Sequence, residues 1–247
     1  MDAQVKTNGD EFIDQLAVNL GKNIGETHGH SRDRFLECYA ASTTVQAWRS
    51  LLLEDLIKHG SIGFLAEAQN DIVIASVLAQ SGAWRSAMKS LRSAIENVIR
   101  FAYYIDHPIE YELWETGKHR PTFQSFFTYL KEHPRIAEIE TKLSTINELE
   151  KSYKNLSNVV HASAKDLRIT DQDGKILIWK TDKASLGKWF TEHRRVLLHL
   201  NMLLLCLFSI HLTGAKLLPL RAALSQVIPA AKATIIRTDL KVNIPKS

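Results

Sequence analysis

WRSAMKSLRSAIENVIRFAYYI, residues 84–105, is the stretch of the chain with the clearest helical pattern. Its apolar residues recur at alternating steps of four and three, which places them on one stripe of an α-helix. The stripe consists of Trp84, Met88, Leu91, Ile95, Val98, Ala102 and Ile105. Pro108 follows, and a proline lacks the backbone N–H that would continue a helix. The stretch therefore predicts a long amphipathic helix that packs one face against a core.

Helical periodicity also dominates the rest of the 247 residues, which include only 11 Gly and 6 Pro. So few turn-forming residues indicate long elements. We expect an all-α fold, specifically an up-and-down helical bundle. The other expected helices cover about residues 10–20, 31–59, 62–80, 122–132, 134–160, 183–212 and 220–228. Glycines at 21, 25 and 29 predict a loop between the first two, and Glu110–Trp114 predicts a short turn.

One small β-hairpin insertion is expected within this helical fold, over about residues 167–180. Two β-prone runs there flank Asp173-Gly174, and Asp-Gly is a strong hairpin signal. Residues 1–9 are expected to be a flexible N-terminus and residues 237–247 a loosely held tail. A single helical domain over residues 10–236 remains between them.

The two cysteines, Cys38 and Cys206, lie in apolar helical patterns without another Cys or His at zinc-ligand spacing. We interpret them as buried thiols of a reducing compartment and expect no metal and no other cofactor. Met1–Glu11 is too polar and acidic for a signal peptide, so the expected location is the cytoplasm. A net charge of +4, with 10 His not counted, mildly favours a polyanionic partner.

The segment Val196–Leu212 is strongly apolar and invites two interpretations. It is slightly short for a transmembrane helix, and it contains His199 and Asn201, which are costly in a bilayer unless they are paired. We therefore expect a central helix that is buried nearly all round, and no membrane insertion. A membrane-spanning helix is the alternative.

The polar residues Glu150, Lys154, Ser157 and His161 follow one another by four, three and four positions, so they share one helix face. An imidazole exchanges a proton near neutral pH, and an ammonium stabilises developing negative charge. The face is thus suited to proton transfer beside a phosphate. Asn158 and Lys165 lie alongside it. The alternative is a solvated helix face without a function.

A second polar series, Arg92, Glu96 and Arg100, recurs every four residues on the helix quoted first. The two arginines could hold phosphate while Glu96 orients a group of the site; alternatively, the series is an exposed ladder of ion pairs. His28 and His30 without a carboxylate make a poor metal site, and Thr213–Lys216 lacks the full phosphate-loop spacing. The tryptophans are expected to anchor core or interfaces rather than stack on bases; those considered are Trp84, Trp114, Trp179 and Trp189.

The run YKNLSNVVHA, residues 153–162, resembles the polar helix of the HEPN superfamily, in which a basic residue, often followed by Asn, precedes a His by several positions. The run SLRSAIENVIR, residues 90–100, is similar to the paired long helix of such bundles. The family's basic position is usually Arg, and here it is Lys154, which lacks the planar fork that grips phosphate. Two other Arg-to-His pairs fit the loose spacing, namely Arg100 with His107 and Arg194 with His199.

The resemblance implies a HEPN-like bundle that forms a homodimer and binds or cleaves RNA without a metal, often in a toxin–antitoxin or phage-defence system. It also implies that His161 acts as general base or acid, that Lys154 stabilises the phosphorane, and that Asn155 and Ser157 position the phosphate. Arg92, Glu96, Arg100 and Asn158 would bind substrate. The alternative function is a non-catalytic helical scaffold or regulatory subunit that binds a protein partner from the same system.

Overall fold

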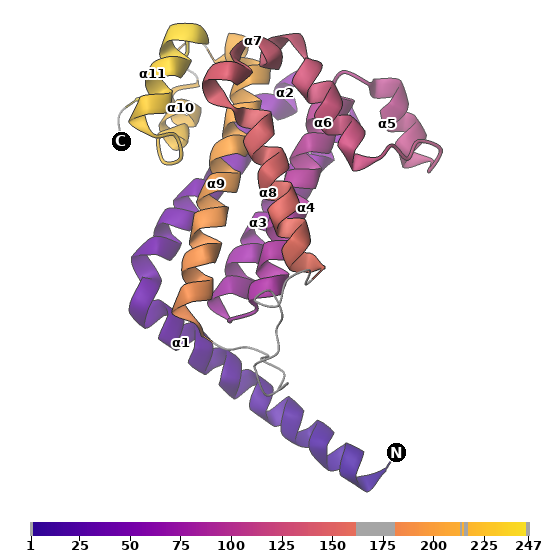
Figure 1. Cartoon of the computed structure of the whole chain (residues 1–247), viewed down its shortest axis with the longest axis vertical. Helices are drawn as coiled ribbons and strands as arrows, with labels where there is room; N and C mark the ends of the chain where they lie inside the picture. Colours follow the sequence, from indigo (N-terminus) through magenta and orange to yellow (C-terminus); the bar gives the residue numbers. More distant parts are fainter. Residues whose placement is uncertain (1, 162–180, 213, 215–216, 246–247) are drawn as a thin grey trace.

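The computed structural model describes residues 2–161, 181–212, 214 and 217–245. All the regular structure in these residues is helical, which confirms the all-α class. The hairpin predicted over residues 167–180 lies outside the described residues. Five long helices run lengthwise beside one another, and short helices gather at one end of this bundle (Figure 1). The long helices are α1 (Ala3–Trp48), α3 (Gly63–Gln80), α4 (Trp84–Tyr104), α8 (Thr145–Val160) and α9 (Lys183–Phe208).

The short helices lie beyond the ends of α4 and α8 and around the last turns of α9 (Figure 1). They are α5 (Pro108–Glu115), α6 (Phe123–Glu132), α7 (Pro134–Leu143), α10 (Leu218–Leu224) and α11 (Ala230–Asp239). A π-helical turn over Arg49–Leu53 and the three-residue α2 (Glu54–Leu56) continue α1. Single 3-10 turns cover Gly60–Ile62 and Ser209–His211.

Helix α4 occupies the middle of the bundle, where it packs against α3, α8 and α9. The predicted stripe is buried, with Leu91, Ile95 and Val98 fully inaccessible to solvent. Burying one such side chain contributes about 1.5–3 kcal/mol. The helix therefore presents its opposite, polar face, with Arg92 and Glu96, at the surface beside α8.

Helix α9 is buried nearly all round in its second half, as expected for Val196–Leu212. Its internal polar group Asn201 is satisfied, because its Nδ2 donates to Thr44 Oγ1 at 2.8 Å and its Oδ1 accepts from Trp48 Nε1 at 3.0 Å. By length and composition, Gly60–Gln80 and Lys183–His211 could each cross a membrane. The most apolar window of the second is 72% buried inside the protein, against 33% for the first.

The loop predicted at the glycines of positions 21, 25 and 29 was wrong, because α1 begins at Ala3 and continues through them. Each glycine in a helix costs about 1 kcal/mol relative to alanine, a weak preference that contacts elsewhere override. Asn23 Nδ2 donates to the Ser81 carbonyl at 3.1 Å, so this part of α1 is attached to the end of α3. The only non-helical backbone inside α1 is at Ser31, with φ −145°, where the helix kinks.

The single helix predicted over residues 134–160 is two helices, α7 and α8, separated by Ser144 in the left-handed conformation (φ 50°). Across the break, the Glu140 carboxylate accepts hydrogen bonds from the backbone N–H groups of Thr145, Ile146 and Asn147 at 2.9–3.1 Å. Periodicity missed the break because the apolar stripe continues across it in phase.

Three smaller predictions also need correction. The turn predicted at Glu110–Trp114 is part of α5. The last predicted helix is shorter than expected, and α11, which was not predicted, follows it. The region predicted as a loose tail begins inside α11, and it buries Val242 and Ile244, which are 2% and 7% exposed.

Candidate functional site

Arg92 joins the two predicted polar series, because its guanidinium reaches from α4 to α8. Its Nε donates to Ser157 Oγ at 3.0 Å, and its Nη2 donates to the Tyr153 hydroxyl at 2.7 Å. The same guanidinium lies 4.8 Å from the centre of the Tyr153 ring. Ser157 in turn donates to the Tyr153 carbonyl at 2.8 Å. The structure thus places a predicted substrate-binding residue against a predicted catalytic one.

Glu96 provides the carboxylate of this cluster. It pairs with Arg92 at 2.8 Å, accepts a hydrogen bond from the Tyr153 hydroxyl at 3.2 Å, and lies 4.0 Å from Arg100. The ion pairs of the alternative interpretation are present on α4, but they are partly buried and contact α8 instead of forming an exposed ladder. Tyr153 was missed as a site residue. Its spacing of four from Ser157 was the available signal, since it puts both on one helix face.

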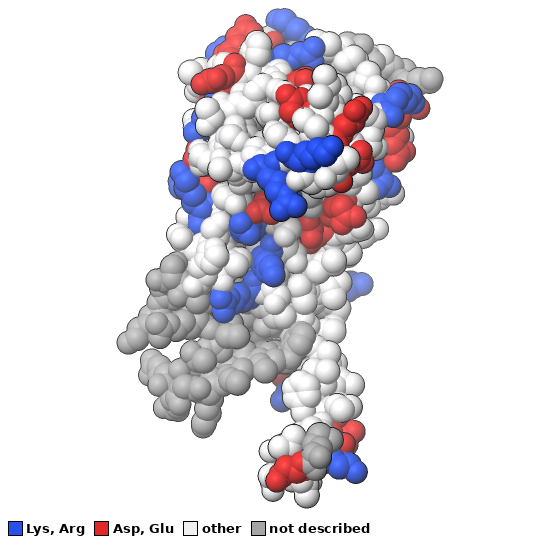
Figure 2. Space-filling view, turned by 90° about the vertical axis from the view of Figure 1, so that its right-hand side faces the viewer, with Lys and Arg blue, Asp and Glu red and all other residues white. Residues whose placement is uncertain are grey.

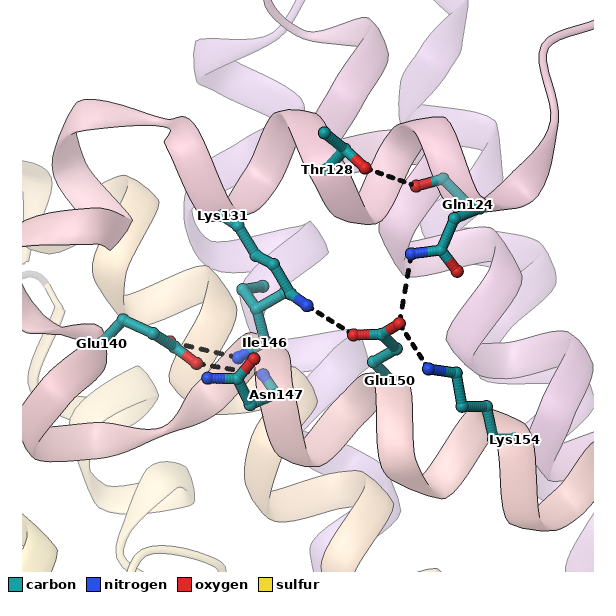
Figure 3. Close-up of polar contacts among 8 residues, drawn as sticks. All are labelled: Gln124, Thr128, Lys131, Glu140, Ile146, Asn147, Glu150 and Lys154. Carbon is teal, nitrogen blue, oxygen red and sulfur yellow. Dashed lines mark hydrogen bonds and ion pairs between the residues drawn. The ribbon is translucent and has the colours of Figure 1, made fainter.

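Lys154 is held by Glu150, one turn earlier on α8, with Nζ 2.7 Å from Oε1 (Figure 3). Glu150 also pairs with Lys131 of α6 at 2.5 Å and accepts from Gln124 at 3.1 Å. The hydrogen bonds from Lys131 and Lys154 lower the pKa of Glu150 to about 2. Because the Lys154 side chain is 63% exposed and that of Glu150 only 11%, Lys154 is the partner that solvent and ligands can reach.

His161 is the C-terminal cap residue of α8, and it is exposed. Its backbone N–H donates to the Ser157 carbonyl at 3.0 Å, so it lies one turn beyond the Arg92–Ser157 contact. Arg85 of α4 donates to the Val160 carbonyl with its Nε at 3.2 Å and also through its Nη2. Sequence reasoning missed Arg85, which fastens the end of α8 that carries His161.

Asn155 is not brought to this cluster. It is exposed and lines a shallow cavity between α8 and α9, together with Lys188 and Thr191. Two residues along a helix correspond to a rotation of about 200°, so Asn155 and Ser157 point to different sides. Asn158 is exposed beside Ser157, and Lys165 lies outside the described residues.

Basic side chains mark the face of the molecule that carries α5, α6 and the exposed side of α8 (Figure 2). Lys and Arg gather in its upper half and continue downward in a broken line, with acidic side chains beside them. This arrangement is mixed in sign rather than uniformly positive.

The other candidate residues are placed elsewhere. His199 is buried in α9, and burial lowers its pKa to about 4, whereas Arg194 is exposed. His107 stacks on Tyr103 with ring centroids 4.0 Å apart. His28 hydrogen-bonds Gln80 at 2.6 Å. Arg194 and His199 therefore share no surface, because one is exposed and the other is buried.

The cysteines are buried as predicted, and burial raises the pKa of both thiols, Cys38 and Cys206, to about 12. Within the described part of the chain, no group of three or more His, Cys, Asp or Glu residues is placed to hold a metal ion. Comparisons with protein-family models, with curated proteins and with solved structures find no match for this chain.

Proposed function

We propose that this chain is a HEPN-like protein that binds single-stranded RNA and cleaves it without a metal ion. The observation that carries the proposal is the reach of Arg92 across to Ser157, beside the exposed Lys154 and His161 of the same helix. Cationic and hydroxyl groups of this kind bind phosphate oxygens, and an exposed imidazole at the end of the helix supplies a proton acceptor.

The proposed reaction is an internal transfer of the phosphodiester. His161 accepts the proton of a ribose 2′-hydroxyl, the 2′-oxygen attacks phosphorus, and the bond to the 5′-oxygen of the next nucleotide breaks. The leaving 5′-oxygen takes up a proton from water, and His161 releases its proton to solvent, so the products are a 2′,3′-cyclic phosphate and a 5′-hydroxyl. Arg92 stabilises the charge of the phosphorane, a role that the resemblance gave to Lys154. The Lys154 ammonium releases the Glu150 carboxylate and binds the phosphate instead. Asn155 has no role in the proposed reaction.

Further parts of the proposal rest on the HEPN resemblance alone. They are a homodimer, a role in a toxin–antitoxin or phage-defence system, and a partner protein from that system. Sedimentation velocity over a range of concentrations tests the homodimer. A sedimentation coefficient of the 27.9 kDa monomer at all concentrations would contradict it.

The main experiment is cleavage of a labelled single-stranded RNA in the presence of EDTA. We expect His161→Ala to abolish the activity and Arg92→Gln to lower it by about 10²–10³-fold, as loss of one charge-stabilising donor does in other enzymes. Lys154→Ala should have a smaller effect, because Glu150 already neutralises part of its charge. The matched control is Lys151→Ala, which removes an equally exposed lysine that is paired with Glu148 instead of Glu150.

The chemical end of the product and the behaviour of the variants both test the proposed site. Cleaved RNA should end in a 2′,3′-cyclic phosphate, which polynucleotide kinase under acidic conditions removes. Equal cleavage by the wild type and all four variants would indicate a contaminating nuclease and would contradict the site. Absence of cleavage by every protein would contradict the ribonuclease and leave binding to be measured by fluorescence anisotropy.

A second candidate function is a non-catalytic scaffold that binds a protein partner. Helix α3 supports it, because Val73, Ile74 and Val77 are 49%, 48% and 56% exposed and lie within one helical turn. Contiguous exposed aliphatic side chains are typical of protein interfaces. This alternative predicts that RNA stays intact in the cleavage assay and that Val77→Lys abolishes binding of the partner.

A further inference from the structure

An open cavity of about 470 Å³ lies between the C-terminal part of α4, the end of α5 and the start of α6. Its walls combine aromatic rings with cationic groups. The aromatic rings belong to Tyr104, Trp114, Phe123 and Phe126, and the cationic groups to Arg100 and Arg120. Arg100 also belongs to the polar series of α4 that contacts α8, so the cavity adjoins the proposed RNA site.

The aromatic wall is partly fixed and partly accessible. Tyr104 is fully buried and Phe126 is 3% exposed, so both belong to the core, whereas Trp114 is 38% exposed. The Trp114 ring packs on Phe64 with centroids 4.9 Å apart, which fixes the position of the indole. The position of the Trp114 ring is therefore fixed, and the ring is accessible at the cavity, so Trp114 is not a buried core anchor.

The cationic groups lie on two sides of the cavity. The Arg100 guanidinium is 5.8 Å from the centre of the Phe123 ring. In the part of the chain that the structure describes, no carboxylate lies within 4.0 Å of Arg120, and none of the lining residues is Asp or Glu. Arg120 therefore brings to the cavity a positive charge that no carboxylate of the described residues pairs with, whereas Arg100 is paired with Glu96.

The loop that carries Arg120 is held in its conformation. Arg120 Nε donates to the Gly117 carbonyl at 3.3 Å, and Gly117 has φ +72°, which side chains rarely adopt. His119 adds a contact at the base, with Nδ1 3.4 Å from the Tyr104 hydroxyl. A pocket whose walls are formed before the ligand arrives binds with a smaller entropic cost.

We infer that this cavity binds one unstacked base of a single-stranded RNA, with Arg100 and Arg120 on the flanking phosphates. Single-stranded RNA is recognised mainly by stacking of splayed bases on aromatic rings and guanidinium planes. Arg100 is two helical turns from Arg92, about 12 Å along α4, so one strand could contact both groups. The inference rests on the proposed function, because the same strand must reach the Arg92–Ser157 cluster.

The test measures binding of a fluorescein-labelled single-stranded oligoribonucleotide of about ten residues by anisotropy, in EDTA and with His161→Ala in the background to prevent cleavage. Trp114→Ala should weaken binding roughly 5- to 100-fold, and Trp114→Phe should restore most of it. Arg120→Gln should weaken binding and reduce the dependence of log Kd on log salt by about 1. Lys118→Gln removes an exposed charge from the same loop without lining the cavity and should have a much smaller effect.

A set of oligonucleotides with a single abasic site identifies the bound base. One abasic position should weaken binding by the His161→Ala protein but not by its Trp114→Ala derivative. Competition with adenosine monophosphate shows whether the cavity binds an RNA strand or a free mononucleotide. If the mononucleotide binds in a Trp114-dependent way and RNA does not, the assignment to RNA is overturned.

The two proposals fail separately. If Arg92→Gln weakens RNA binding while Trp114→Ala and Arg120→Gln behave like Lys118→Gln, the cavity inference is wrong and the proposed function stands. If the wild type binds no single-stranded RNA, both are wrong. Thermal unfolding of each variant identifies loss of binding that is caused by loss of the fold.

Discussion

Glu150 shows how one carboxylate sets the charge available near the proposed site. It holds Lys131 and Lys154 together, and their hydrogen bonds lower its pKa to about 2, so it stays ionised across the physiological range. A phosphate that approaches Lys154 must compete with this carboxylate. Arg92 is also paired, with Glu96, but its guanidinium has enough donors to contact Ser157 and Tyr153 as well. Both cations keep spare donors, and we propose Arg92 for phosphate stabilisation because its planar fork matches phosphate geometry, which an ammonium does not.

A buried histidine provides the pH prediction at this scale. His193 is 1% exposed, and burial lowers its pKa to about 4 from 6.5. Between these two pH values His193 is mostly neutral in the folded protein and mostly protonated in the unfolded chain. Its contribution to stability is complete above pH 6.5 and is lost as the pH falls towards 4. Between pH 7 and 4.5 the wild type should lose about 2 kcal/mol more than His193→Gln.

Urea denaturation at each pH measures this difference. His30→Gln, which changes an exposed histidine of α1, is the matched control and should keep the wild-type pH dependence. If the free energy of unfolding depends on pH in the same way for His193→Gln and for the wild type, the burial of a neutral His193 is contradicted.

At the scale of elements, the spacing of apolar residues predicted those helices in which the same spacing also determines the buried face. The stripe of residues 84–105 became α4 with nearly the same bounds, because its spacing both forms the helix and defines its buried face. The break at Ser144 could not be read from period alone, since it depends on Glu140 turning back onto the next helix. The candidate site was likewise predictable only in part. The shared face of α8 followed from residue spacing, whereas the roles of Tyr153 and Arg85 depend on contacts between α4 and α8.

The Glu140 carboxylate yields a prediction for the start of α8. It satisfies three backbone N–H groups and places a negative charge at a helix N-terminus, where the helix dipole favours it. Glu140→Ala should therefore lower the free energy of unfolding by about 1–2 kcal/mol. Urea denaturation at pH 7 measures the change, with Glu138→Ala on the exposed side of α7 as control. Equal stability of the two variants would exclude the capping role.

At the scale of the whole molecule, a bundle of five long helices positions everything else. Helices α4 and α9 form its interior, and α8 lies over both, which leaves the polar face of α4 accessible along one side. The N-terminal part of α1 projects beyond the end of this bundle (Figure 1). Hydrophobic spacing predicted the helices and much of the core. It could not predict which helices become neighbours, because many packings bury the same stripes. The cavity between α4, α5 and α6 therefore emerged only in three dimensions.

The arrangement of the bundle also predicts how the whole protein partitions between water and detergent. The segment Lys183–His211 is apolar enough to span a bilayer, yet its most apolar window is mostly buried, and Asn201 is bound to Thr44 and Trp48 of α1. Withdrawing α9 into lipid would break these hydrogen bonds and expose the apolar faces of its neighbours. The segment Gly60–Gln80 is less buried, but its partner α4 covers one side.

We expect the wild type to remain in the aqueous phase after Triton X-114 phase separation. Asn201→Asp, which puts a carboxylate at the centre of the core, should unfold the protein rather than change its partition while folded. Recovery of the folded wild type in the detergent phase would show that α9 or α3 leaves the bundle for the membrane.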